Sequence, residues 1–187
     1  MSAAASMLPE LDASVPISEN LLTTVLEPYS FKGCRYLLEA VSQSDGASVL
    51  AQGSFAITES CYIRSTGHFN AVELVLCFNQ LAYSAFAPAI ANEVIPAFWG
   101  WTVDDYVKHQ LSSMYIRTSS AHFIRPINAE KFYARLHCHD LQIVERSVRY
   151  LRVPCDIEFF DENGGRATGQ FELAALNIPG NQPSPGQ

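Results

Sequence analysis

Residues 61–73, which read CYIRSTGHFNAVE, hold the densest group of side chains able to do chemistry in this sequence. His68 is the strongest acid–base candidate among them, because an imidazole with a pKa of about 6.5 exchanges protons near neutral pH. The structural alternative for His68 is a hydrogen bond that fixes the loop. A long apolar stretch follows directly, which places these polar side chains at the start of a helix.

Asn70 and Glu73 stand three residues apart at the beginning of that stretch, which is the spacing of a helix capping box. The structural interpretation of both residues is therefore helix capping. The chemical interpretation is that free N–H groups and the positive end of the helix dipole, roughly half an elementary charge, polarise a bound carbonyl. The sequence leaves both interpretations open.

Four further side chains have both a chemical and a structural explanation. Arg64 is able to pair with a carboxylate or a carrier's phosphate, although a single loop arginine more often forms a surface ion pair. Asn79 lies inside the apolar stretch, where its amide either bridges to a strand or holds a water or a carbonyl oxygen. Tyr29 and Tyr62, two of the chain's 8 tyrosines, are candidate phenol donors, with packing as the structural alternative.

Several familiar signatures are missing from the sequence. It contains no GxSxG motif of serine hydrolases and no GxGxxG or P-loop motif for dinucleotides or ATP. His137 and His139 alternate on one face of an expected strand, but no second group of ligands accompanies them. We therefore expect neither a metal nor a cofactor.

The elements expected to position these residues begin with a short helix over 17–26, capped by Ser18 and ending before Pro28. Segments 35–41 and 48–57 are β-like and form a hairpin. Residues 70–92 are apolar on nearly every side, which is typical of a helix surrounded by other elements. Pro88 is expected to stop or kink that helix.

A long run of strands follows the central helix. The Asp-Asp-Tyr of segment 99–109 begins another short helix, and four strands are expected over 113–123, 131–141, 146–161 and 166–177. The Asn-Gly step within 161–165 suits a tight turn between the last two strands. One buried helix followed by an antiparallel meander predicts an α+β hotdog fold, in which a curved sheet wraps a long central helix.

The bulk properties predict one cytoplasmic domain over 17–178, with flexible tails at 1–16 and 179–187. The 187 residues carry a net charge of −7, which argues against nucleic-acid binding because phosphate contacts need a basic face. Five cysteines without a CxxC motif indicate reduced thiols that pack in the core. Glu73, Asn79 and Gln80 interrupt the longest apolar run, so we expect no membrane span.

The blocks LEPYSFKGCRYL, SCYIRSTGHFNAVELVLCFNQLAYSAFAP, DDYVKHQLSSM, YLRVPCDIEFFDENGG and ELAALNIP resemble the FcoT family of mycobacteria and streptomycetes. The resemblance covers nearly the whole chain between the tails. It implies a hotdog fold, a homo-oligomer, and an enzyme acting on acyl thioesters. For family members in isonitrile lipopeptide clusters, it implies addition of glycine to the β-carbon of a (2E)-enoyl group on an acyl carrier protein, followed by thioester hydrolysis.

The resemblance also suggests roles for individual residues. His68 or Glu73 would deprotonate the glycine ammonium and activate water. The residues that would orient water and the carbonyl are Tyr29, Tyr62, Asn70 and Asn79. The residues expected to contact substrate are Arg64, Gly67, Lys32 and Arg35, with Arg64 as the first choice for the glycine carboxylate.

Two competing functions use the same residues. The first is an acyl-CoA or acyl-carrier thioesterase that uses only water. The second is a non-catalytic acyl-binding hotdog subunit, which would bind an acyl thioester and release it unhydrolysed.

Overall fold

The computed structural model describes residues 8–9, 11 and 14–179. The predicted tails therefore fall largely outside the described residues, although the chain already joins the sheet at Val15–Pro16. The helices are α1 (Glu19–Val25), α2 (Glu27–Ser30), α3 (Ala71–Ala91), the 3-10 turn η1 (Pro96–Phe98) and α4 (Val103–Ser113). The strands are β1 (Val15–Pro16), β2 (Leu37–Ser44), β3 (Val49–Phe55), β4 (Met114–Arg125), β5 (Phe132–Cys138), β6 (Gln142–Glu145), β7 (Arg149–Phe160) and β8 (Arg166–Leu176).

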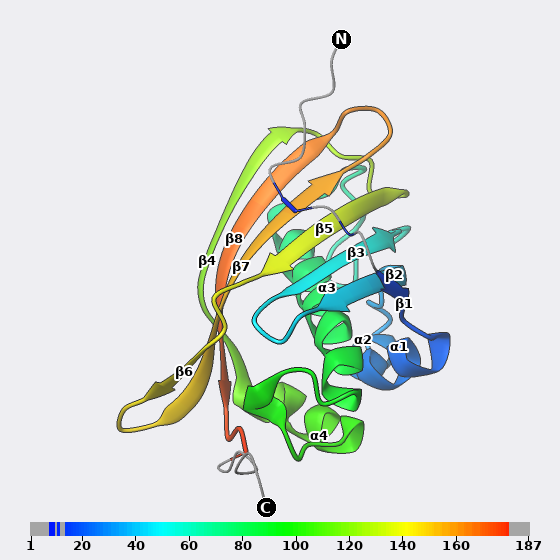
Figure 1. The fold of residues 1–187 in the computed structure, drawn as a ribbon. Helices are drawn as coiled ribbons and strands as arrows, with labels where there is room; N and C mark the ends of the chain where they lie inside the picture. The colour runs from blue at the N-terminus through cyan, green and yellow to red at the C-terminus, as the bar shows by residue number, and fades with distance from the viewer. Residues whose placement is uncertain (1–7, 10, 12–13, 180–187) are drawn as a thin grey trace, which may run out of the picture.

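The strands form one antiparallel sheet in the order β1-β2-β3-β5-β7-β8-β4, with the short β6 paired to β7. The sheet curls around the long helix α3, while α4 lies near the C-terminal end of that helix (Figure 1). This arrangement confirms the predicted α+β hotdog fold. Strands β1 and β6 were not predicted, because strands of two and four residues are too short to show alternation.

Helix α3 has the expected bounds and the expected capping box, in which Asn70 and Glu73 each accept from the other's backbone N–H. The prediction that Pro88 stops the helix is wrong, because α3 continues to Ala91. Asn92 holds the last turn by donating to the Pro88 carbonyl from its backbone N–H at 3.1 Å and from its side chain at 2.8 Å. Burial of the last turn through Ala89 and Ile90 outweighs the local cost of proline.

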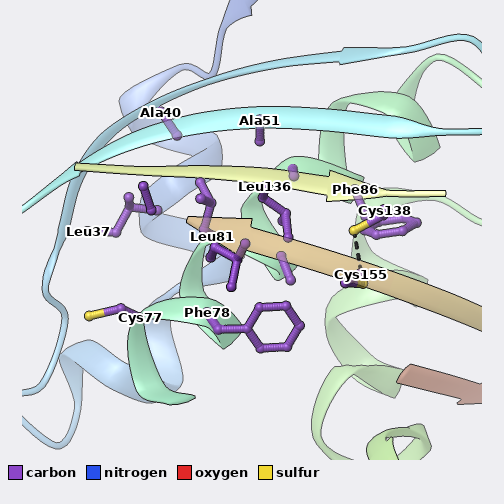
Figure 2. Packing of buried hydrophobic residues seen from close by; sticks show 14 of the residues in the cluster. Leu37, Ala40, Ala51, Cys77, Phe78, Leu81, Phe86, Leu136, Cys138 and Cys155 are labelled. Carbon is purple, nitrogen blue, oxygen red and sulfur yellow. Dashed lines mark hydrogen bonds between the residues drawn. The ribbon is translucent and has the colours of Figure 1, made fainter. Parts of the chain in front are cut away.

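The core lies between α3 and the concave face of the sheet. Leu37, Ala40 and Ala51 of β2 and β3 point toward Phe78 and Leu81 of the helix (Figure 2). A side chain at Gly53 would stand 2.6 Å from Leu37 Cδ1 and 3.1 Å from Leu81 Cδ1, so glycine permits the close approach of β3. By length and composition α3 would also cross a membrane, but 67% of its apolar window is buried inside this fold.

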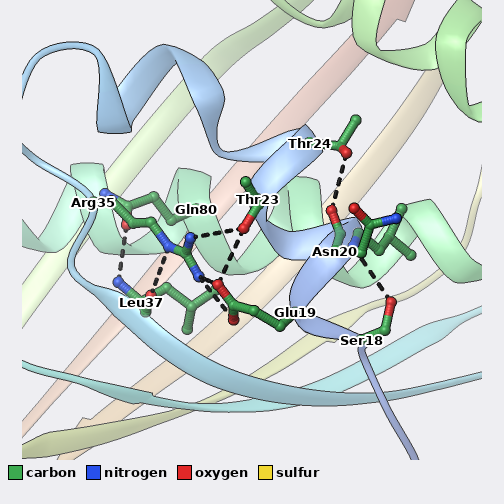
Figure 3. A network of polar contacts seen from close by, with 9 residues as sticks. Ser18, Glu19, Asn20, Thr23, Thr24, Arg35, Leu37 and Gln80 are labelled. Atoms are coloured by element: carbon green, nitrogen blue, oxygen red, sulfur yellow. Dashed lines mark hydrogen bonds and ion pairs between the residues drawn. The ribbon is translucent and has the colours of Figure 1, made fainter.

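Polar side chains fasten the segment after α2 to the central helix. The buried Gln80 accepts from the backbone N–H groups of Tyr36 at 2.8 Å and Leu37 at 3.0 Å. It donates to the Cys34 carbonyl at 2.8 Å. Arg35 joins the same segment to α1 through Glu19, at 2.9 Å (Figure 3). The segment that follows α2, the helix that carries Tyr29, is thereby tied to α3.

We predict that Gln80→Met lowers the free energy of unfolding by at least about 2 kcal/mol, because it leaves the backbone groups of Cys34, Tyr36 and Leu37 without partners inside the core. Denaturant titration measures the change. The matched control is Gln142→Met on the exposed part of β6, which should stay within about 0.5 kcal/mol of the parent. Equal midpoints for the two variants would show that Gln80 is not a structural link.

Candidate active site

An apolar cavity of about 260 Å³ lies between α3, α4 and the strands β4, β7 and β8. Phe86, Phe98 and the fully buried Tyr106 form part of its wall at the α4 side. Two polar side chains of α3, Asn79 and Tyr83, also line it. A cavity with apolar walls and few polar groups suits a small apolar ligand that carries one polar function.

Asn79 faces the cavity with an uncommitted amide. Within the part of the chain that the structure describes, it makes no hydrogen bond. Tyr83 lies one helical turn further on, so both side chains occupy the same face of α3. The Tyr83 hydroxyl donates to the Gln110 carbonyl over 3.4 Å, which is long for an O–H donor. Sequence reasoning found Asn79 and missed Tyr83, although the spacing of four residues would have indicated it.

Tyr29 lies near Tyr83, outside the cavity lining. Burial, followed by the influence of Tyr83, Cys34 and Cys77, raises the pKa of Tyr29 well above its ordinary value. No other described residue forms a hydrogen bond with its hydroxyl. Tyr29 therefore stays protonated at neutral pH and is able to donate a hydrogen bond.

A second group of polar residues lies at the N-terminal end of α3. His68 and Asn70 line a groove of about 380 Å³ together with Phe123 and Arg125 from the end of β4. The Tyr62 hydroxyl donates to Asn70 Oδ1 at 2.8 Å. The structure therefore brings His68, Asn70 and Tyr62 together, as the sequence suggested. It adds Arg125, which had no local signal because it lies in a strand.

The ring of His68 is oriented by its own loop. Its Nδ1 lies 3.1 Å from the Thr66 carbonyl oxygen. Because a carbonyl only accepts hydrogen bonds, Nδ1 carries the proton in this contact, and Nε2 of the neutral ring keeps its lone pair. The exposed Nε2 is thus able to accept a proton. Both the loop-fixing and the acid–base interpretations of His68 fit this geometry.

The N-terminal amides of α3 are mostly occupied by the capping box. Asn70 Oδ1 accepts from Val72 and Glu73, and the Asn70 carbonyl accepts from Leu74. Among these first amides, only that of Ala71 has no partner in the described residues. The expectation that several free amides polarise a carbonyl is therefore wrong. Glu73 is 2% exposed and accepts from the Asn70 N–H at 3.2 Å, a structural role.

None of the four residues predicted to contact the substrate lines the cavity or the groove. Arg35 is committed to Glu19, and Lys32 lies over the Phe31 ring at 5.2 Å. Gly67 adopts φ +75° in the loop before the helix. Arg64 is exposed and has no ion pair or hydrogen bond with the described residues. Arg64 therefore remains available for a ligand, while Arg35 does not.

Within one chain, the polar residue Asn79 at the cavity lies far from His68 and Asn70 at the groove. Asn79 follows Asn70 by nine residues, which corresponds to about 13 Å along the helix and roughly half a turn around it. Asn79 therefore lines the cavity, whereas His68 and Asn70 line the groove and Tyr62 is bonded to Asn70. A single chain does not bring both groups to one reacting atom.

The paired histidines His137 and His139 lie at the end of β5, where their ring centroids are 5.0 Å apart. His139 contacts Asp140 through Nδ1 at 2.9 Å and Asp156 through Nε2 at 3.0 Å. Burial, followed by the neighbouring His139, lowers the pKa of His137. Over 8–9, 11 and 14–179, no cluster of three or more His, Cys, Asp or Glu side chains is arranged to hold a metal ion.

A central helix wrapped by an antiparallel sheet, with an apolar cavity against that helix, defines a hotdog-fold protein. The chain matches the FcoT-like thioesterase domain over residues 24–175 and belongs to that family of enzymes.

Three relatives carry the name (2E)-enoyl-ACP glycyltransferase. The one from Mycobacterium marinum is 66% identical over 91% of this chain and 92% of its own length. The one from Mycobacterium tuberculosis is also 66% identical, over 89% of this chain and 91% of its own length. The one from Streptomyces coeruleorubidus is 34% identical over 86% of this chain and 98% of its own. The thioesterase structure yhdA from Lactococcus lactis aligns with a TM-score of 0.46 and 11% identity over 78% of this chain and 94% of that chain. The fold assignment rests on this chain's own topology.

The loop between β3 and α3 offers a chemical test of these positions. Four cysteines are buried, as expected, but Cys61 is exposed. Burial and the neighbouring Cys61 raise the pKa of Cys34 to about 11. We predict that a thiol reagent at pH 8 labels one cysteine per native chain rapidly and all five after unfolding. Cys61→Ser should remove the rapid phase, and a second rapid thiol in the native protein would contradict this placement.

Proposed function

We propose that this protein adds glycine across the double bond of a (2E)-enoyl group on an acyl carrier protein and then hydrolyses the thioester. The product is a 3-(carboxymethylamino) fatty acid, a precursor for isonitrile lipopeptides. The observation that carries this proposal is the 66% identity, over about nine-tenths of the chain, with relatives named for that transfer. The cavity supports it, because apolar walls beside one uncommitted amide suit an acyl chain ending in a carbonyl.

The chemistry has two steps that share one oxygen atom. In the first, the amine of glycine forms a bond to the β-carbon, and the electrons of the double bond move onto the thioester oxygen as an enolate. The new ammonium loses a proton, and the α-carbon gains one. In the second, water attacks the carbonyl carbon, the C–S bond breaks, and the leaving thiolate takes a proton. Each step places negative charge on the thioester oxygen.

His68 is our choice for the proton acceptor in both steps. Its Nε2 carries a free lone pair, because the Thr66 carbonyl holds the proton on Nδ1. Glu73 is the weaker candidate, since its carboxylate is buried and committed to the capping box. Tyr62 and Asn70 are joined by a hydrogen bond, and the Nδ2 group of Asn70 stays free to orient water.

A second copy of the chain would complete the site. Strand β4 forms an edge of the sheet, and all of its residues from Arg117 to Arg125 are exposed. Such an edge is a template for another strand. Residues 114–116 at the start of β4 line the cavity, and residues 123–125 at its end line the groove. If β4 pairs antiparallel with β4 of a second copy, the start of one strand lies opposite the end of the other. The cavity of one copy would then lie beside the groove of its partner. We therefore propose a homodimer or a higher oligomer.

This pairing would bring together the groups that one chain keeps apart. Asn79 and Tyr29 would come from one copy, and the residues of the groove from the other. The carrier protein and free glycine are the proposed partners, and a cytoplasmic location fits the reduced thiols and the net charge of −7.

Mass spectrometry of the reaction with a (2E)-enoyl carrier protein, with and without glycine, tests the activity. We expect a free acid heavier by one glycine only when glycine is present. A matched saturated acyl carrier protein should give unadducted acid in both conditions, because it has no electrophilic β-carbon. Unadducted acid from the enoyl substrate would instead indicate a simple thioesterase, and tight binding without release would indicate an acyl-binding subunit.

A complementation experiment tests the composite site. We expect His68→Asn and Asn79→Ala each to lose at least about tenfold in kcat as homo-oligomers, the usual scale of acid–base catalysis. Mixed oligomers of the two variants should recover activity, because half of their sites contain both native residues. Mixtures of each variant with itself are the control. Mixed oligomers that stay as inactive as their parents would place both residues in one chain's site.

A further inference from the structure

The thioester oxygen needs hydrogen-bond donors that the N-terminus of α3 does not supply. This requirement rests on the proposed function, since both steps develop negative charge on that oxygen. The Asn70 side chain occupies the amides of Val72 and Glu73, and the Asn70 carbonyl occupies that of Leu74. Donors directed at the acyl carbonyl must therefore come mainly from side chains beside the cavity.

Asn79 and Tyr83 are the two polar side chains of α3 in that cavity. Their spacing of four residues sets them on one face of the helix. The Cβ atoms of two residues at this spacing are about 5–6 Å apart. Two donors at this separation are able to approach one oxygen from two directions. The amide of Asn79 has no competing partner among the described residues.

The phenol of Tyr83 is held loosely. Its only hydrogen bond within the described residues runs to the Gln110 carbonyl over 3.4 Å, whereas O–H donors typically lie about 2.7–2.8 Å from an acceptor. A charged oxygen would be a stronger acceptor than this distant carbonyl. Burial raises the pKa of Tyr83, so the phenol keeps its proton at neutral pH.

The backbone of Tyr83 is held in place by helix α4. The buried Tyr106 donates from its hydroxyl to the Tyr83 carbonyl at 3.0 Å, which ties α4 to this turn of α3. Gln110 in turn donates to the Val25 carbonyl at 3.0 Å, which ties α4 to α1. The phenol of Tyr83 is thus presented by a rigid part of the fold, as an oxyanion donor requires.

We infer that Tyr83 is a catalytic residue of this protein: together with the Asn79 amide, its hydroxyl donates a hydrogen bond to the thioester oxygen as negative charge develops there. Tyr83 keeps its proton throughout both steps. It stabilises the enolate of glycine addition and the tetrahedral intermediate of hydrolysis, so one change should slow both reactions.

Tyr83→Phe tests this role, because it removes only the hydroxyl. We expect kcat to fall about 100-fold for glycine addition and also for hydrolysis of a saturated acyl carrier protein, with KM for either substrate within about threefold of the parent. The control is Tyr133→Phe, which removes a hydroxyl bound to Glu162 on the outer face of the sheet. Its kcat should match the parent. A kcat for Tyr83→Phe within about twofold of the parent in both reactions would overturn the inference.

Difluorotyrosine at position 83 provides a second variant that keeps the shape of the side chain. Fluorine lowers the pKa of a phenol, and a phenolate cannot donate. We therefore expect kcat of this variant to decline at alkaline pH values where the parent is still fully active. A pH profile that coincides with that of the parent would argue against a donor role.

The outcomes separate this inference from the proposed glycine transfer. If the parent enzyme only hydrolyses thioesters, the transfer is wrong, and the hydrolysis rate of Tyr83→Phe still decides the role of Tyr83. If the parent forms the glycine adduct and Tyr83→Phe does so equally fast, the transfer stands and only the role of Tyr83 is wrong.

Discussion

The enclosure of α3 by the sheet is the constraint on which the rest of this structure depends. An apolar helix that is covered on most sides leaves few places for a polar side chain, and each one must find a partner or serve a ligand. Gln80 shows the first outcome, because three backbone groups satisfy its amide. Its neighbour Asn79 faces a cavity and makes no hydrogen bond within the described residues, which leaves its amide for the proposed ligand. Of two adjacent amides on one helix, one is thus structural and the other is the proposed chemical group.

The same enclosure separates the chemical groups. The polar loop before α3 must stay at the end of the helix, where water reaches His68, while the cavity lies further along the opposite side. Strand β4 runs past both places, since its start lines the cavity and its end lines the groove. An antiparallel pair of such strands would reverse that order and join the two halves. In the proposed oligomer, the exposed edge of the sheet would therefore complete the site as well as be covered.

The capping box illustrates how one set of atoms serves either stability or catalysis. Asn70 and Glu73 satisfy the first amides of α3, which fixes the start of the helix and the position of His68 beside it. Those amides are then no longer free to polarise a substrate. Stabilisation of negative charge has to come from side chains in the cavity, where a lower dielectric strengthens each hydrogen bond. In the proposed reaction, the helix terminus would position the base, and the middle of the helix would supply donors.

The sequence by itself determined the fold class, the bounds of the central helix and its capping box, because apolar periodicity and cap residues act locally. It also identified His68, Asn70 and Tyr62 as neighbours, since they lie in one short loop. Only the tertiary structure decided that Arg35 is committed to Glu19, that α3 continues past Pro88, and that Tyr83 and Arg125 line the two hollows. Each of these depends on contacts between segments far apart in the chain. Local sequence patterns do not predict such contacts, because long-range packing decides which polar side chains remain free.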